Sequence, residues 1–233
     1  MERRADRAPP AAPRSRLRAR PAEALSECAL PAGPTELGLA KGRDGLLHVP
    51  VAARSRPAPL VVLLHGAGSS AASAILLLAE LTETHGVMLL VPDSRGSSWD
   101  FLRAGFGPDV EFIDRALGHV FERCAIDPAR VALAGFSDGA SYALSLGIAN
   151  GDLFTHLIAF SPGFAAPETQ VGKPRMFVTH GTSDAVLPVD ACSRRLVPVL
   201  RAGGYDLTYE EFDGGHSVPR DLARRAIAWA VGG

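Results

Sequence analysis

The residue whose sequence context most clearly indicates a chemical role is a serine at the centre of a Gly-x-Ser-x-Gly motif. The motif, GFSDG at 135–139, follows the apolar run 131–134 and precedes a stretch compatible with a helix. A strand, a sharp turn and a helix in that order strain the backbone of the central residue and expose its hydroxyl. Gly135 and Gly139 suit such a turn because a Cβ atom at either position would clash with neighbouring chain. We therefore predict that Ser137 is a nucleophile.

A serine hydroxyl needs a base to accept its proton, and that base needs an acidic group to orient it. The segment HGTSD follows an apolar run and places Asp184 in the loop after a predicted strand. The segment DGGHS follows another predicted strand and does the same for His216. Three other acids are alternatives to Asp184 in less suitable positions: Asp190, Asp206 and Asp213. The predicted order along the chain is nucleophile, acid, base.

The elements that position these residues are visible from about residue 37 onward. Short apolar runs alternate there with amphipathic segments, as buried strands and covering helices do. Five runs are almost continuously apolar, at 60–64, 87–91, 131–134, 156–160 and 175–179, and the more polar run 207–212 suits an edge strand. Helices are predicted from Pro108, after Ser137, around Leu196 and from Pro219. The pattern predicts an α/β fold with a mostly parallel central sheet and helices on both faces, whose ligands bind at the carboxyl ends of the strands.

Four motifs together, HGAG at 65–68, GFSDG, HGTSD and GGHS, resemble those of the α/β-hydrolase superfamily of serine esterases. The resemblance covers about residues 45–233. Within the superfamily the sequence is similar to the small lidless phospholipase/carboxylesterase group and to related bacterial depolymerase-type esterases. The order Ser137, Asp184, His216 is the order of that superfamily. The resemblance implies an α/β-hydrolase fold and cleavage of carboxylic esters through an acyl-enzyme, without a cofactor.

The same resemblance implies an oxyanion hole built from two backbone N–H groups. We assign one of them to Ala67, with Gly68 as the alternative, and the other to Asp138. The side chain of Asp138 departs from the family, where a neutral residue usually follows the serine. A carboxylate beside a developing oxyanion should oppose it, but the first turn of a helix favours a carboxylate by about 0.3–1 kcal/mol. We expect this carboxylate to point away along the helix end.

Substrate access is predicted to be open. Residues 161–174, between two predicted strands, are too few for the helical cap that larger members of the superfamily carry at this point. An uncapped site admits small-molecule esters and bulky or polymeric ones. The long loop 92–108 carries Trp99, which we place beside the acyl group, the alternative being that it anchors the loop against the core. Phe136, next to the nucleophile, is also assigned to substrate binding.

Two other functions are open to the same residues. A serine peptidase or amidase uses the same triad, but peptidases of this superfamily commonly add a propeller or a cap. A non-catalytic α/β-hydrolase-like binding protein is the other alternative. It is disfavoured because all three triad positions are filled.

The composition and motifs of the sequence argue against several other classes of protein. No clustered His, Asp and Glu set has metal-ligand spacing, and no GxGxxG motif lies at a strand–helix junction, so no metal site and no dinucleotide is expected. Residues 1–20 carry seven arginines against two acids, whereas the remainder has a net charge of −6. A basic face for nucleic acid is therefore not expected. The longest apolar stretch, residues 71–79, is far shorter than the roughly 20 residues of a membrane span.

Residues 1–30 are rich in Arg, Pro and Ala, and we predict a largely disordered tail followed by a single catalytic domain at 31–233. Arg3 and Arg4 suit a twin-arginine export signal, but no apolar segment follows them. The cysteines are odd in number and lack metal-ligand spacing, which argues against a disulfide framework; they are Cys28, Cys124 and Cys192. We therefore expect a reducing compartment and a cytoplasmic protein.

Overall fold

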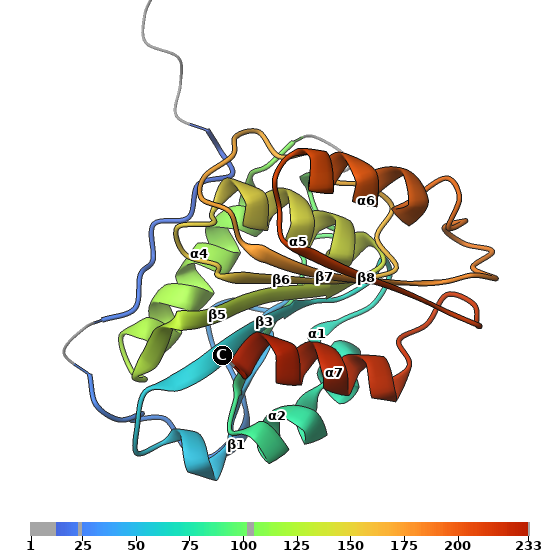
Figure 1. Cartoon of the computed structure of the whole chain (residues 1–233). Helices are drawn as coiled ribbons and strands as arrows, with labels where there is room; N and C mark the ends of the chain where they lie inside the picture. The colour runs from blue at the N-terminus through green and yellow to red at the C-terminus, as the bar shows by residue number, and fades with distance from the viewer. Residues whose placement is uncertain (1–12, 23–24, 102–104, 233) are drawn as a thin grey trace, which may run out of the picture.

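A central sheet with helices on both faces forms the body of the molecule (Figure 1). The computed structural model describes residues 13–22, 25–101 and 105–232, and the structural statements below concern these residues. The strands are β1 (Gly33–Glu36), β2 (Gly45–Val49), β3 (Ala58–Leu64), β4 (Met88–Pro92), β5 (Ile126–Phe136), β6 (His156–Phe160), β7 (Arg175–Gly181) and β8 (Leu207–Phe212). The helices are α1 (Ala71–Ala74), α2 (Ala79–His85), α4 (Pro108–Phe121), α5 (Asp138–Ala149), α6 (Ser193–Ala202) and α7 (Arg220–Val231), with 3₁₀ turns η1 (Val51–Ala53) and η2 (Ile75–Leu77).

The strand order is β1-β2-β4-β3-β5-β6-β7-β8. Strands β4, β3, β5, β6, β7 and β8 run parallel, while β1 and β2 are antiparallel additions at one edge. All six predicted strands are present, and β8 lies at the other edge as its polar residues indicate. The mostly parallel α/β fold is therefore confirmed.

The two antiparallel strands are absent from the sequence prediction. β1 has four residues, begins Gly-Pro and buries none of them, so it carries no hydrophobic signal. β2 alternates buried and half-buried residues over only five positions. Both pair with neighbouring strands through the backbone, and this pairing depends on the fold rather than on local residue type.

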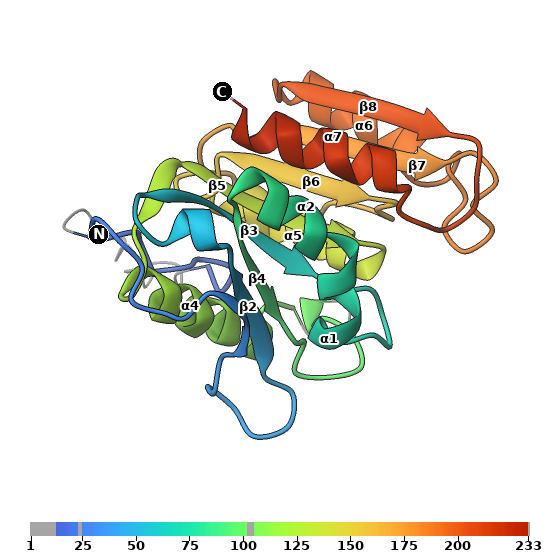
Figure 2. The same cartoon turned by 90° about the horizontal axis from the view of Figure 1, so that it is seen from below.

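Alternate residues of the buried strands supply two separate cores. In β3, Leu60, Val62 and Leu64 face the core beneath α4, α5 and α6. Val61 and Leu63 face the core beneath α1, α2 and α7. Figures 1 and 2 show these two helical layers on opposite faces of the sheet. A parallel strand covered on both faces must be apolar at every position, which explains why its residues form a continuous apolar run.

The prediction of a largely disordered tail does not hold for residues 13–22. Leu17 is 2% exposed, and its N–H donates to Oδ1 of Asn150 at 2.9 Å. The Asn150 side chain in turn donates to the carbonyl of Ser15 at 2.7 Å. Arg16 forms a two-pronged ion pair with Asp152, which holds the pKa of that carboxyl well below its usual range. The segment therefore packs onto the domain, while residues 1–12 lie outside the described part of the chain.

This packing has no local signal because its partners lie 95 or more positions away in the sequence. A single leucine among arginines does not predict burial, and Asn150 reads in the sequence only as the end of a helix. The side-chain amide of Asn150 both donates and accepts, so it satisfies two backbone groups of an otherwise irregular segment. Tertiary contact alone gives this segment its conformation.

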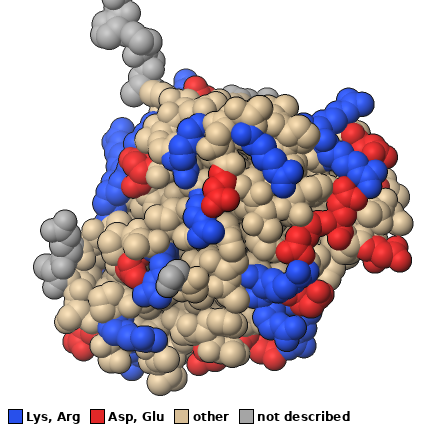
Figure 3. Space-filling model, in the orientation of Figure 1, with Lys and Arg blue, Asp and Glu red and all other residues tan. Residues whose placement is uncertain are grey.

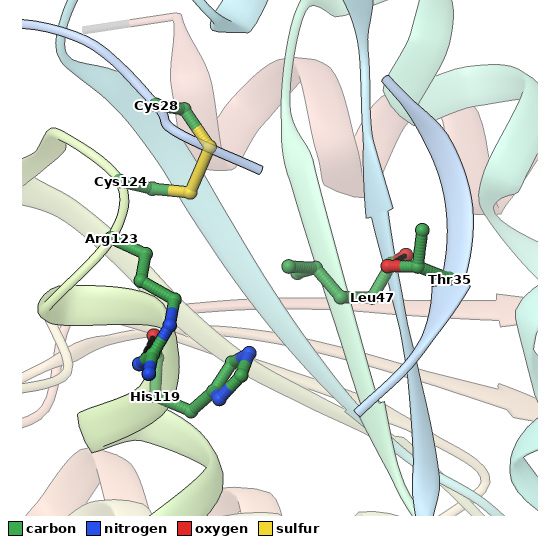
Figure 4. The surroundings of a disulfide bond; sticks show 6 residues. All are labelled: Cys28, Thr35, Leu47, His119, Arg123 and Cys124. Atoms are coloured by element: carbon green, nitrogen blue, oxygen red, sulfur yellow. Dashed lines mark hydrogen bonds between the residues drawn. A yellow bond between two sulfur atoms is a disulfide. The ribbon is translucent and has the colours of Figure 1, made fainter. Parts of the chain in front are cut away.

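Cys28 and Cys124 form a disulfide (Figure 4). The backbones also pair here, since the Ala29 N–H donates to the Arg123 carbonyl at 2.7 Å. The expectation of no disulfide is therefore wrong: an odd number of cysteines leaves room for one pair and one free thiol, here the buried Cys192. Stable disulfides are typical of oxidising compartments, so the cysteines no longer support a cytoplasmic location.

The surface shows no segregation of charge on the face drawn in Figure 3, where acidic and basic side chains are interspersed. In the described part of the chain, no helix combines the length and the apolar character needed to cross a bilayer.

We expect Asn150→Ala to loosen residues 13–22. The substitution leaves the Leu17 N–H and the Ser15 carbonyl without their buried partner, at a cost of about 1–3 kcal/mol in the free energy of unfolding. Hydrogen exchange of the peptide that contains Leu17 should accelerate. Asp152→Asn is the comparison variant, because it weakens two partly exposed ion pairs of the same segment, those to Arg16 and Arg20, and should cost less than about 1 kcal/mol. Unchanged exchange in Asn150→Ala would contradict the anchoring role.

In protein that is denatured without a reductant, we expect a single reactive thiol, that of Cys192. Alkylation under these conditions should modify Cys192 alone, and prior reduction should make all three cysteines reactive. Intact-mass measurement distinguishes the two results, and Cys192→Ser serves as the control that should take no label before reduction. Three alkylated cysteines without reductant would show that Cys28 and Cys124 are not paired.

Candidate active site

Ser137 lies at the tip of a tight turn between β5 and α5. Its φ of 58° and ψ of −120° place it in a conformation that side-chain-bearing residues rarely adopt. A Cβ atom on Gly135 would lie 2.1 Å from the Gly139 carbonyl oxygen, and one on Gly139 would lie 2.2 Å from the Leu64 carbonyl oxygen. The predicted need for both glycines is therefore confirmed, because the turn leaves no space for a side chain at either position.

The three predicted triad side chains form one hydrogen-bonded chain. His216 Nε2 lies 2.8 Å from Ser137 Oγ, and His216 Nδ1 lies 2.6 Å from Asp184 Oδ2. The serine follows β5, the aspartate follows β7 and the histidine follows β8. Residues separated by up to 79 positions thus meet at the carboxyl edge of the sheet.

This arrangement selects one tautomer of His216. The carboxylate of Asp184 accepts only, so Nδ1 carries the proton and donates it to that carboxylate. Nε2 is then left with its lone pair toward the Ser137 hydroxyl. An imidazole held in this way is able to remove the serine proton, which is what general-base activation of a hydroxyl requires.

Asp184 is buried, 5% exposed, and surrounded by donors. Its Oδ1 accepts from the backbone N–H groups of Val186 at 2.9 Å and Leu187 at 2.8 Å. Burial acts to raise the pKa of this carboxyl, but the hydrogen bonds, foremost those from Leu187 and His216, outweigh burial and lower the pKa below its usual range. The carboxylate is therefore held in its ionised form.

A second histidine also contacts Asp184. The ring of His180 is fully buried, with Nε2 at 2.7 Å from the Leu187 carbonyl and 3.3 Å from Asp184 Oδ2. Its Nδ1 lies 2.7 Å from the Ser193 hydroxyl. The sequence reads His180 only as the first residue of a turn, and no local pattern indicates its contact with the acid. Its place is structural, and it fixes the loop that carries Asp184.

The alternative acids are engaged or exposed elsewhere. Asp190 pairs with Arg194 at 2.8 Å, and Asp206 pairs with Arg175 at 3.0 Å. Asp213 is exposed. Of the four candidate acids, Asp184 is the one whose carboxylate contacts His216.

An open, mostly apolar cleft of about 390 Å³ contains the serine and the histidine. Ala67 lines it beside Ser137, as does Phe136, whose ring lies 4.7 Å from the ring of His216. The remaining lining residues are His65, Gly66, Ser69, Ser73, Ala74, Leu77 and Val186. Residues 161–174 contain no helix or strand, so they form no helical cap over this cleft.

The structure distinguishes between Ala67 and Gly68, the two alternative oxyanion donors of the HGAG loop. The Gly68 N–H donates to the Ser97 carbonyl at 2.6 Å and is therefore occupied. Ala67 is exposed on the cleft. The Asp138 N–H lies in the first turn of α5, where the helix itself offers no acceptor. The Asp138 side chain does not line the cleft, and its Oδ2 accepts a hydrogen bond from Ser98 at 2.5 Å.

Trp99 does not line the cleft that contains Ser137 and His216. It is fully buried, and its Nε1–H donates to the His65 carbonyl at 2.9 Å. Its ring packs against His65 and Tyr142, with centroids about 5 Å away. These contacts do not fit the assignment of Trp99 to the acyl pocket and favour the alternative, in which Trp99 anchors the loop against the core. An indole N–H needs an acceptor when buried, and the carbonyl of His65, the first residue of the HGAG turn, provides it.

Among the described residues, no group of three or more His, Cys, Asp or Glu side chains is placed to hold a metal ion. The chemistry that the arrangement can perform is that of an activated serine next to backbone N–H donors.

Comparison with known proteins places the fold. No protein-family model and no curated protein sequence matches the chain. The structure of esterase PE8 superimposes with a TM-score of 0.66 at 26% sequence identity, over 79% of this chain and 96% of that one. Fluorophosphonate-binding serine hydrolase F from Staphylococcus aureus gives 0.71 at 15% identity, over 87% and 99%. A phospholipase/carboxylesterase from Dyadobacter fermentans gives 0.64 at 19% identity, over 87% and 99%.

The lowered pKa of Asp184 predicts a specific effect of acid on stability. A carboxyl whose folded pKa is depressed stabilises the protein above its unfolded pKa of about 4, and this contribution is lost as the pH falls through the folded pKa. Between about pH 5 and pH 2, the free energy of unfolding should therefore fall more for the wild type than for Asp184→Asn. Urea unfolding at stepped pH measures this difference. Asp213→Asn, at an exposed site, should keep the wild-type slope, and parallel curves for Asp184→Asn and wild type would contradict the prediction.

Proposed function

We propose, from the α/β-hydrolase fold that the chain shares with these structures, that the protein is a serine hydrolase that cleaves carboxylic esters. The similarity to α/β-hydrolase esterases extends over most of the chain and confirms the predicted fold. The observation that carries the proposal is the unbroken hydrogen-bonded chain from Asp184 through His216 to Ser137 at a strained turn. Fold alone would not support it, because one fold hosts many activities.

The proposed reaction begins with proton transfer from Ser137 Oγ to His216 Nε2 as the oxygen attacks the ester carbonyl. The N–H groups of Ala67 and Asp138 would stabilise the negative oxygen of the tetrahedral intermediate. His216 then gives its proton to the departing alcohol, leaving an acyl group on the serine. Water, activated by the same histidine, releases the acid. Asp184 stays ionised throughout and keeps His216 oriented.

The form of the cleft favours an ester whose groups near the scissile bond are apolar. Leu77, Phe136 and Val186 contribute apolar side chains to its lining, and Val186 is 65% exposed. Because the cleft is open rather than enclosed, it would admit a small ester as well as an accessible ester group of a larger or polymeric molecule. The chemical class proposed is therefore a carboxylic ester whose groups near the scissile bond are uncharged, as cleaved by carboxylesterases and phospholipase-like esterases.

The test is covalent labelling followed by turnover. A fluorophosphonate should label Ser137, and p-nitrophenyl esters of increasing chain length should be hydrolysed faster than a matched panel of peptide amides. Ser137→Ala should lose the label and about 10⁴-fold or more of kcat/KM. Ser55→Ala, an exposed serine at the opposite end of β3, is the matched control and should behave as wild type.

Two results would contradict the proposal. Folded wild-type protein that takes no label on Ser137 would indicate a non-catalytic binding protein. Protein that labels but cleaves the amide panel in preference to esters would indicate a peptidase or amidase.

A further inference from the structure

Residues 94–100, here called the strap, contact the loop that carries the first oxyanion donor. Trp99 Nε1–H donates to the His65 carbonyl at 2.9 Å, and the Gly68 N–H donates to the Ser97 carbonyl at 2.6 Å. These two bonds hold the peptide groups on either side of the Gly66–Ala67 peptide. The direction of the Ala67 N–H is therefore set by the strap.

His65 adds a third link between the same two segments. Its Nδ1 lies 2.7 Å from the Gly66 carbonyl, and its Nε2 accepts from the Ser94 N–H of the strap at 3.0 Å. Burial lowers the pKa of this histidine, and the nearby positive charge of Arg43 acts in the same direction. The neutral ring keeps one donor and one acceptor, which is what these two bonds require.

The strap also reaches the second oxyanion donor. The Ser98 hydroxyl donates to Asp138 Oδ2 at 2.5 Å, across 40 positions of sequence. Asp138 directly follows the nucleophile, so its carboxylate and its N–H belong to the same first turn of α5. Neither Ser98 nor Asp138 is one of the described residues that line the cleft. The carboxylate is thus held on the strap side of the turn.

The strap is itself fixed to the two helices beside it. The Asp100 N–H donates to Asp109 Oδ2 at 2.6 Å, and the Asp109 N–H donates back to Asp100 Oδ2 at 2.8 Å. The Tyr142 hydroxyl of α5 donates to Asp100 Oδ1 at 3.0 Å. Asp109 is 1% exposed and lies in the first turn of α4. These reciprocal bonds give the strap a defined position from which to orient other groups.

A free carboxylate at this point would oppose the reaction. The ester oxygen becomes negative only in the transition state, so a nearby negative charge raises the barrier without weakening the binding of a neutral substrate. A hydroxyl that donates to the carboxylate both disperses its charge and restricts its rotation. A neutral residue at position 138 would need no such partner.

We propose that Ser98 is a positioning residue of the oxyanion hole, whose hydroxyl holds the Asp138 carboxylate away from the oxygen that becomes negative. The inference rests on the proposed function, since it assigns a role to Ser98 in that same reaction. It goes beyond the triad because it identifies the group that makes an aspartate after the nucleophile compatible with catalysis.

A double-mutant cycle tests the pairing. In the wild-type background, Ser98→Ala should lower kcat on a neutral p-nitrophenyl ester about tenfold or more while KM changes less than twofold. In the Asp138→Asn background, adding Ser98→Ala should lower kcat less than twofold, because no charge remains to be held. Ser98→Thr keeps the hydroxyl and should retain at least half of the wild-type kcat. Fluorophosphonate labelling rates of the same variants should follow kcat.

The outcomes separate the two proposals. An equal loss of kcat in both backgrounds, or no loss in either, overturns the role of Ser98 while leaving the hydrolase intact. Wild-type protein that neither labels nor turns over an ester overturns the proposed function and this inference with it. Thermal unfolding checks that each variant is folded, and Ser98→Cys, with its weak donor, replaces Ser98→Ala if the alanine variant does not fold.

Discussion

The backbone of Ser137 is held at a φ of 58° by close contact with the strands around it. Its N–H donates to the Phe160 carbonyl of β6 at 2.9 Å. Gly139 lies so close to the Leu64 carbonyl of β3 that a Cβ atom would clash with it. A strained conformation of this kind costs about 1–3 kcal/mol and persists only where the surrounding structure determines it. The sheet provides that surrounding, because β3 and β6 flank β5 on either side. The position of the serine hydroxyl, and with it the whole site, depends on this constraint.

Polar groups at the carboxyl edge of the sheet are satisfied by one another, which gives the site its fixed geometry. Asp184 receives two backbone N–H groups, and the imidazoles of His216 and His180 also contact it. On the other side of the serine, the buried Trp99 supports the HGAG turn. In the proposed reaction, a site built this way needs little rearrangement when charge develops on the substrate, and such preorganisation is the usual source of electrostatic catalysis.

The N-terminal segment shows a different use of buried hydrogen bonds. Residues 13–22 form no regular structure, yet Leu17 is buried and Asn150 satisfies the backbone groups beside it. Farther along, the Cys28–Cys124 disulfide ties the chain to the end of α4, across a separation of 96 residues. A covalent link over so long a loop restricts the unfolded chain, with stabilisation typically of about 2–5 kcal/mol. The segment is thus part of the folded domain although its composition resembles that of a tail.

The sequence by itself determined the elements whose signal is local. Continuous apolar runs marked the five strands from β3 to β7, because strands covered on both faces are apolar throughout, and the more polar run 207–212 marked β8 as an edge strand. Two glycines marked the turn at Ser137, because only glycine fits there. The order of Ser137, Asp184 and His216 followed from the strand-end loops that carry them. Tertiary structure alone decided the roles of residues whose partners lie far away: the burial of Trp99, the packing of Leu17, the pairing of Cys28, and the bond from Ser98 to Asp138. The physical reason is that a hydrogen bond or a disulfide is a property of two groups, and a local pattern describes only one of them.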